Sequence, residues 1–185
     1  MIIKKVIARA IKDSRGKKTI QVIVKTSRKF KTSAPEGKST GKYETKPYLR
    51  NLEEDIKFVN NLKTDIINKI IKRQGNKKLS YSQSFLLLQD IEKIVKNKIG
   101  ANSLFALEAS LLKALAYENG KELWEFLGGK KHLFSKKDAG KKFNLRPVGN
   151  AIGGGLHGEG INKKEPDFQE FLFIANGKTF KNVLK

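Results

Sequence analysis

The sequence contains no cysteine and only two histidines, His132 and His157. Without cysteine, disulfides, thiolate metal sites and cysteine nucleophiles are excluded. The two histidines are not at the spacing of zinc ligands, which argues against a zinc site. No apolar run approaches the ~20 residues that span a bilayer, and Met1 to Lys5 lacks the apolar core of a secretory signal. A cytoplasmic protein with no membrane partner is therefore expected.

Acidic residues are also scarce, 18 against 39 Lys and Arg, so the net charge is +21 and the pI is about 10.1. Such a charge first suggests nucleic acid. However, 33 of the cations are lysines and no basic run exceeds two residues. Lysine is a solvated point charge and does not read bases as the bidentate guanidinium of arginine does. We therefore interpret the lysines as a solubilising surface with incidental polyanion binding, and keep a basic polyanion-binding protein as an alternative function.

The first 130 residues predict an α+β domain, with a three-stranded antiparallel meander followed by a helical bundle. A first strand is expected at 2–10, which is rich in apolar residues, and a second at 19–26, where apolar and polar residues alternate. Gly16 suits the turn between them, and a third strand is expected at 28–33. Apolar residues at helical spacing predict helices over 52–75, 80–95, 103–118 and 121–127.

The remaining residues predict a second domain that is begun but not completed. Residues 131–145 are rich in lysine and show no periodicity, which is typical of a linker or an exposed loop. Residues 146–152 and 167–174 then predict two strands, and 179–185 the first turns of a helix. Two strands and a helical fragment do not bury two faces of a sheet. The expected domains are therefore 1–130 and an incomplete 146–185, joined by the linker.

The segment from Ser33 to Gly41 (SAPEGKSTG) is one of two candidate functional sites. It contains Gly-Lys-Ser-Thr, but a P-loop also needs glycine at position 32, which is Thr32. A nucleotide-binding P-loop is therefore rejected. Two interpretations remain: a mobile surface loop, or a lid whose Ser39 offers oxygen ligands to a hard cation such as Mg²⁺.

The second candidate site runs from Gly149 to His157 (GNAIGGGLH) and on to residues 167–171 (DFQEF). An isolated histidine after three glycines suits phosphate contact or proton relay, although a structural or merely exposed histidine is the common case. A buried carboxylate is costly, so Glu170 inside an apolar strand either pairs with a lysine or acts as an acid or base. Gln169 and Glu170 point to opposite faces of a regular strand, so they share a site only near a strand end or bulge.

Taken together, these segments resemble the enolase family (phosphopyruvate hydratase), in what looks like an archaeal-style version. The resemblance rests on four motifs in the family's order, and it spans essentially the whole chain. They are the DSRG turn within 11–16, the loop 34–41, the Gly-Ala-Asn motif at 100–102, and the segment 147–157 followed by 167–171.

The resemblance implies an enzyme that interconverts 2-phosphoglycerate and phosphoenolpyruvate with two Mg²⁺ ions, and that usually forms a homodimer. By resemblance, Ser39 would ligate the second Mg²⁺ and His157 would approach the substrate phosphate. Gln169 would lie near substrate and metal, and Glu170 would belong to the acid side of the proton relay. The family's catalytic lysine and its three carboxylate ligands for the first Mg²⁺ correspond to no residue of this chain.

The sequence departs from the family at Glu36 and Lys38 in the loop and at Gly153 in the second motif.

The sequence leaves three hypotheses about function. The chain is an enolase N-terminal part, truncated or completed by a separate barrel chain, and inactive alone. Alternatively, it is a non-catalytic module that kept the capping domain for interactions. The third hypothesis is the basic polyanion-binding protein.

Overall fold

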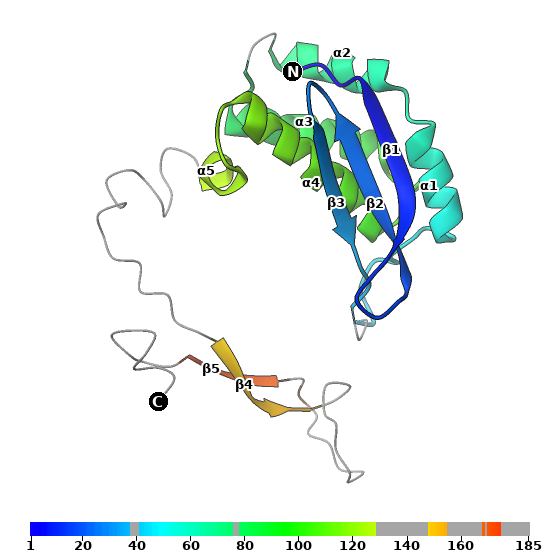
Figure 1. The fold of residues 1–185 in the computed structure, drawn as a ribbon, viewed down its shortest axis with the longest axis vertical. Coiled ribbons are helices and arrows are strands. Elements are labelled where there is room, and N and C mark those ends of the chain that lie inside the picture. The colour runs from blue at the N-terminus through cyan, green and yellow to red at the C-terminus, as the bar shows by residue number, and fades with distance from the viewer. Residues whose placement is uncertain (38–40, 76–77, 129–147, 155–167, 169, 175–185) are drawn as a thin grey trace, which may run out of the picture. The chain divides into compact units, whose positions relative to one another are not determined.

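The computed structural model describes residues 1–37, 41–75, 78–128, 148–154, 168 and 170–174. The chain divides into two compact units, one of Met1–Glu36 with Lys42–Leu133 and one of Gly37–Gly41 with Phe134–Lys185, and each is considered by itself. The first unit holds a three-stranded sheet and helices α1 to α5, and the second holds strands β4 and β5 (Figure 1). The linker over 131–145 and the helix over 179–185 lie outside the described residues, so these domain boundaries remain predictions.

The first unit begins with the predicted antiparallel meander. Strands β1 (Lys5–Lys12), β2 (Lys18–Lys25) and β3 (Lys29–Ala34) pair in sequence order. Gly16 turns the chain between β1 and β2 with a φ of +78°, a conformation that favours glycine. The even-numbered residues of the strands face the core, where Ile20, Val22 and Val24 are fully buried. The α+β fold class predicted from the sequence is confirmed.

Helices cover one face of this sheet. They are α1 (Leu52–Asn60), α2 (Thr64–Gln74), α3 (Tyr81–Val95), α4 (Ala101–Glu118) and α5 (Leu123–Gly128). Helix α4 packs on β2 and β3, and α1 packs on β1 (Figure 1). Small residues let α4 approach the sheet closely, and the hydroxyl of Ser110 donates a 3.1 Å hydrogen bond to the carbonyl of Val22. A capping box of Ser80 and Gln83 starts α3.

The single helix predicted over 52–75 is wrong, because the chain breaks at residues 61–63 into α1 and α2. The two helices place one asparagine each against the N-terminal part of the chain: Asn60 meets the free edge of β1, and Asn68 meets Ile3 just before β1. Asn60 exchanges two hydrogen bonds with the backbone of Ala8 (2.8 and 3.0 Å), and Asn68 does the same with Ile3 (2.9 Å each). These amides satisfy edge groups that would otherwise offer pairing to another strand. Apolar periodicity does not reveal such a break, since both helices continue the same stripe.

The second unit contains a short antiparallel pair, β4 (Val148–Gly153) and β5 (Glu170–Ile174). The ring of Phe173 lies on Gly149 so closely that a Cβ there would come within 2.5 Å of it. The apolar side chains of both strands are more than half exposed, Ile174 being 60% exposed and Leu172 57%. This pair therefore does not form a core of its own from the described residues.

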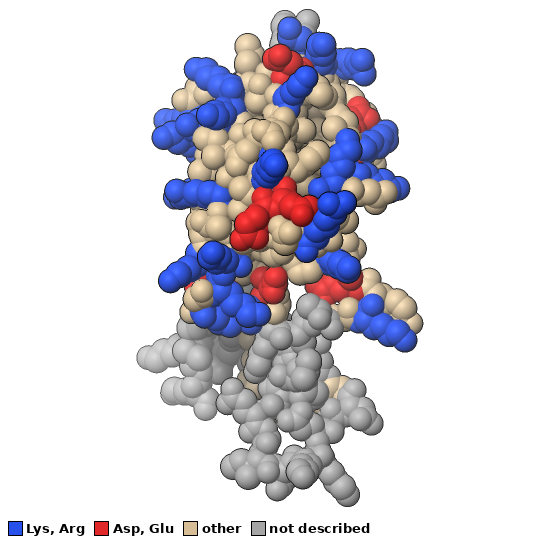
Figure 2. Space-filling model, turned by 90° about the vertical axis from the view of Figure 1, so that its right-hand side faces the viewer, with Lys and Arg blue, Asp and Glu red and all other residues tan. Residues whose placement is uncertain are grey.

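Lysine and arginine side chains spread widely over the surface of the first unit, around a smaller group of acidic ones in the view of Figure 2. Within the described residues, no helix has the length and apolar character needed to cross a membrane.

Candidate functional site

The predicted lid, 33–41, begins within β3, which ends at Ala34, and the rest of it lies in segment 35–47, which is anchored at its start by two side chains. Its preceding residue, Ala34, ends β3, and the carbonyl of Ala34 accepts hydrogen bonds from two groups. The hydroxyl of Thr19 donates at 2.7 Å, and the side-chain amide of Asn102 donates at 2.8 Å. The hydroxyl of Tyr48 lies 3.1 Å from that of Thr19 and extends this network. The chain thus leaves the sheet from a fixed point.

The end of the same segment is anchored on the first turn of α4. The backbone N–H of Ala101 donates to the carbonyl of Lys46 (2.9 Å), and that of Asn102 donates to the carbonyl of Pro47 (3.0 Å). The first N–H groups of a helix have no partner within it, and here the returning chain satisfies two of them. A Cβ on Gly100 would lie 2.3 Å from the Cα of Tyr48, so only glycine fits this crossing. The Gly-Ala-Asn motif therefore contacts both ends of the segment.

A buried carboxylate, that of Asp55 in α1, is hydrogen-bonded to the first turn of α4. Its side chain accepts hydrogen bonds from the N–H of Gly100 (2.8 Å) and from the hydroxyl of Ser103 (2.6 Å). Its second oxygen accepts from the N–H of Leu49 at 3.3 Å. Asp55 is 1% exposed, and a negative charge at a helix N-terminus is favourable. Asp55 of α1 thus holds the start of α4 in place through its N-cap residue, Gly100, and through Ser103 in its first turn.

The turn between β1 and β2 also reaches the segment. The guanidinium of Arg15 donates to the carbonyl of Glu36, and the ammonium of Lys17 lies 3.8 Å from the Glu36 carboxylate. Asp13 holds the turn, because its carboxylate accepts from the N–H groups of Arg15 (2.9 Å) and Lys17 (2.8 Å). Desolvation raises the pKa of Asp13, but these hydrogen bonds and the nearby guanidinium outweigh it and hold that pKa below its usual value.

Of the residues predicted to form the site, only Glu170 lies within the described part of the chain. Ser39, His157 and Gln169 lie outside it. Glu170 begins β5, pairs in register with Gly153, and is exposed. The sequence suggested a carboxylate buried among apolar residues of a strand. Glu170 is instead the first residue of a two-stranded sheet, and no described element packs over it. Its predicted neighbours Phe168 and Phe171 pack edge to face, with ring centroids 4.3 Å apart.

No three Asp, Glu or His side chains among the described residues come together in a group that could hold a metal ion. The described residues alone therefore do not form a primary Mg²⁺ site.

The family model of the enolase N-terminal domain matches residues 3–127. This chain belongs to the enolase family. It is 31% identical over 184 residues to the enolase of Ehrlichia canis, an alignment that covers 95% of this chain and 40% of that protein. It is 32% identical over 182 residues to the enolase of Thermoplasma acidophilum, covering 96% of this chain and 40% of that enolase.

The chain therefore spans about two fifths of the length of the curated enolases that it matches. The family model ends at residue 127, so it covers the sheet, the helical layer and the whole anchor of segment 35–47. The resemblance inferred from the sequence motifs is confirmed. Sequence reasoning missed Asp55, Thr19 and Arg15 as anchors, since an aspartate in the first turn of a helix looks like an ordinary exposed residue.

This enolase chain also has an open groove of about 760 Å³ beside α3 and α4. Its lining includes Glu92 of α3 and Glu108 of α4, together with Lys93, Lys96 and the exposed ring of Phe105. Burial, and then the charge of Glu92, raise the pKa of Glu108 to about 7. Glu108 thus titrates near neutral pH in a groove at the opposite end of α3 from the Ser80 cap.

Proposed function

We propose that this chain provides the N-terminal part of an enolase, the lyase that dehydrates 2-phosphoglycerate to phosphoenolpyruvate. The observation that carries the proposal is the double anchor of segment 35–47. Both of its ends are hydrogen-bonded to the first turn of α4. The side chain of Asn102 bonds the residue before the segment, and the backbone N–H groups of that turn bond its last two residues. A lid must move between fixed ends, and anchored ends limit that movement to the segment between them.

Within this proposal, the described residues position the lid and the other predicted residues bind the substrate. Ser39, inside the anchored segment, would offer its oxygens to one of the two Mg²⁺ ions of the complete enzyme. His157 would contact the substrate phosphate, and Gln169 would lie near substrate and metal. Glu170 would serve the acid side of the reaction. Bound Mg²⁺ would supply positive charge for the developing enolate, and its primary ligands are assigned to no residue of this chain.

The proposed domain organisation follows the same logic. Residues 1–130 would form the capping domain, 131–145 a linker and 146–185 the opening strands of a barrel. The exposed apolar side chains of β4 and β5 support this arrangement, because strands of a closed barrel are covered on both faces. The missing barrel would come from the rest of a longer chain or from a separate polypeptide. The complete enzyme would be a homodimer by its family.

A mixing experiment tests this function. The part of the Thermoplasma acidophilum enolase that follows the matched region is expressed separately and mixed with the 185-residue chain, and phosphoenolpyruvate formation is measured. We expect no turnover by either part alone and turnover by the mixture. Ser39→Ala or His157→Ala in this chain should abolish that turnover without weakening association of the two parts.

The second candidate function is a non-catalytic interaction module, favoured by the exposed apolar faces of β4 and β5. This module would bind its partner whether or not Ser39 and His157 are intact. Association that survives both substitutions, with no turnover in any mixture, would support the module and contradict the half-enzyme.

A further inference from the structure

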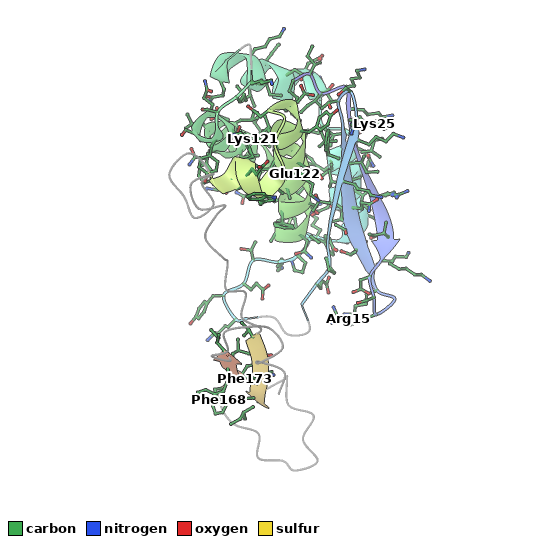
Figure 3. All side chains as sticks on the ribbon, turned by 60° about the vertical axis from the view of Figure 1, so that its left-hand side comes forward. Arg15, Lys25, Lys121, Glu122, Phe168 and Phe173 are labelled. Atoms are coloured by element: carbon green, nitrogen blue, oxygen red, sulfur yellow. The ribbon has the colours of Figure 1, made fainter. Side chains whose placement is uncertain are left out.

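The turn between β1 and β2 lies at the same end of the sheet as the point where β3 ends. This follows from the antiparallel register, in which Ile20 near the start of β2 is paired with Ala34 at the end of β3. Figure 3 shows Arg15 in this turn, at that end of the sheet. The turn therefore reaches the first residues of segment 35–47 without crossing the sheet.

The turn presents two cations to a single residue of this segment, Glu36. The guanidinium of Arg15 donates a hydrogen bond to the carbonyl of Glu36, and the ammonium of Lys17 lies 3.8 Å from its carboxylate. Glu36 is half-buried, whereas Pro35 before it and Gly37 after it are exposed. Glu36 is thus held to the turn through both its main chain and its side chain.

Hydrogen bonds within the turn keep the two cations in place. The backbone N–H of Asp13 donates to the carbonyl of Lys17 (2.8 Å), and that of Gly16 donates to the carbonyl of Asp13 (3.1 Å). The carboxylate of Asp13 also lies 3.5 Å from the guanidinium of Arg15. Because these groups are already ordered by the turn, they lose less conformational entropy when they contact Glu36.

The residue types on either side of Glu36 favour a hinge directly after it. Ala34 is held by two side chains at its carbonyl, and the ring of Pro35 fixes its own φ. Few backbone torsions therefore remain between Ala34 and Glu36. Gly37 has no side chain and adopts a much wider range of backbone conformations. Gly37 is consequently the first residue of the segment that can absorb a change in backbone direction.

We propose that Arg15 and Lys17 form an ionic clamp on Glu36, which positions the start of the proposed lid and places its hinge at Gly37. The inference rests on the proposed function, and the three residues of the clamp are positioning residues. Glu36 is one of two loop positions at which the chain departs from the family pattern, so the ion pair with Lys17 is not part of that pattern. Salt screens exposed ion pairs, so the clamp should weaken as ionic strength rises.

Backbone ¹⁵N relaxation of the full chain tests the clamp without enolase turnover. The order parameter of an amide is about 0.85 in rigid backbone and below about 0.6 in flexible backbone. At about 0.02 M salt we expect the rigid value at Glu36 and the flexible value at Gly37. At about 1 M salt the screening length falls to about 3 Å, and the order parameter of Glu36 should fall toward that of Gly37.

Two variants of equal charge locate the effect. Lys17→Gln removes the ammonium beside Glu36, whereas Lys18→Gln removes the neighbouring charge, and Lys18 forms no ion pair with a described residue. Lys17→Gln should lower the order parameter of Glu36 at low salt, and Lys18→Gln should leave it unchanged. In the double variant Arg15→Gln/Lys17→Gln the order parameter should be lower still, and salt should no longer change it.

Exchanging the two charges tests the ion pair directly. Lys17→Glu places a like charge beside Glu36 and should lower its order parameter. The double variant Lys17→Glu/Glu36→Lys restores opposite charges and should recover the rigid value at position 36. In the mixture of the two enolase parts, Lys17→Gln should reduce turnover by about two- to fivefold at low salt, the effect of one exposed ion pair. The exchanged pair should recover that turnover.

A flexible Glu36 in the unmodified chain at low salt would overturn the clamp, and so would equal effects of Lys17→Gln and Lys18→Gln. Failure of the exchanged pair to recover rigidity would overturn it as well. A loss of rigidity in Lys17→Gln with unchanged turnover would refute the positioning role. An inactive mixture in which relaxation shows a rigid, salt-sensitive Glu36 would contradict the proposed function and not the clamp.

Discussion

The side-chain amide of Asn102 donates a 2.8 Å hydrogen bond to the carbonyl of Ala34, 68 positions earlier in the sequence. This bond joins the first turn of α4 to the residue at which β3 ends and segment 35–47 begins. Asn102 also donates its backbone N–H to Pro47 at the other end of that segment. One residue therefore fixes both ends of the proposed lid.

Asn102→Ala removes the side-chain anchor and should reduce turnover of the complemented enolase about tenfold, since a misplaced lid loses catalytic geometry. The free energy of unfolding should fall by only about 1 kcal/mol, the value of a typical hydrogen bond. Steady-state kinetics and chemical denaturation measure the two effects. Asn119→Ala is the matched control. The side-chain amide of Asn119 also donates to two backbone carbonyls (3.1 and 2.8 Å), but neither belongs to the lid segment. Equal kinetic losses in both variants would refute a positioning role for Asn102.

Gly100→Ala should destabilise the domain by about 2–4 kcal/mol, because the new Cβ would displace the backbone of Pro47 and Tyr48. Gly120→Ala is the control. Gly120 has a φ of +66° and open space around it, so alanine there should lower the free energy of unfolding by about 1 kcal/mol through its backbone conformation alone. Thermal and denaturant unfolding compare the two. A smaller loss for Gly100→Ala than for Gly120→Ala would mean that the crossing at Tyr48 relaxes easily.

Asp55→Asn should cost about 2–4 kcal/mol of stability. Both oxygens of Asp55 accept hydrogen bonds, and an amide would point an N–H group at one of those donors. The exposed neighbour Glu53 provides the control, because Glu53→Gln removes the same charge from the same turn without breaking a buried contact. Its effect should stay within about 0.5 kcal/mol. Similar losses in both would show that the helix dipole, not the buried bonding, matters.

Glu108→Gln should stabilise the domain at pH 8 and leave it nearly unchanged at pH 5. The folded-state pKa of Glu108, about 7, lies above the unfolded value of 4.5, so the folded state binds the proton more tightly. Its contribution is therefore most favourable at low pH and is lost as pH rises from about 4.5 to 7. Melting curves across this range measure it.

Glu92→Gln should give part of the same gain at high pH, because it removes the repelling charge. Glu53→Gln, far from the groove, should leave the pH dependence unchanged. A gain of equal size at pH 5 and pH 8 would show that the effect of Glu108→Gln comes from packing.

The order and type of the elements in the first unit followed from periodicity, because each strand and helix buries one continuous stripe. The break between α1 and α2 did not, because the apolar stripe continues through both helices, whereas the bonds of Asn60 to Ala8 and of Asn68 to Ile3 join distant segments. The motifs in the sequence marked where the site lies, but not how it is held. Asp55, Thr19 and Arg15 act through hydrogen bonds between distant segments, and no local pattern encodes those distances.

Asn102 was predictable in part. As part of the Gly-Ala-Asn motif it was recognisable as a family marker, and its neighbour Gly100 was recognisable as a residue before a helix. Only the fold shows that the two meet segment 35–47 at both of its ends. Ser39, His157 and Gln169 remain predictions of the sequence alone.

The most direct test of the account is the turnover of a single fused polypeptide. Residues 1–185 of this chain are joined in register to the part of the Thermoplasma acidophilum enolase that follows its matched region, and conversion of 2-phosphoglycerate is measured with Mg²⁺. The account predicts that the fusion is active and that Ser39→Ala abolishes this activity. A folded fusion without activity, or turnover by the unfused 185-residue chain, would contradict it.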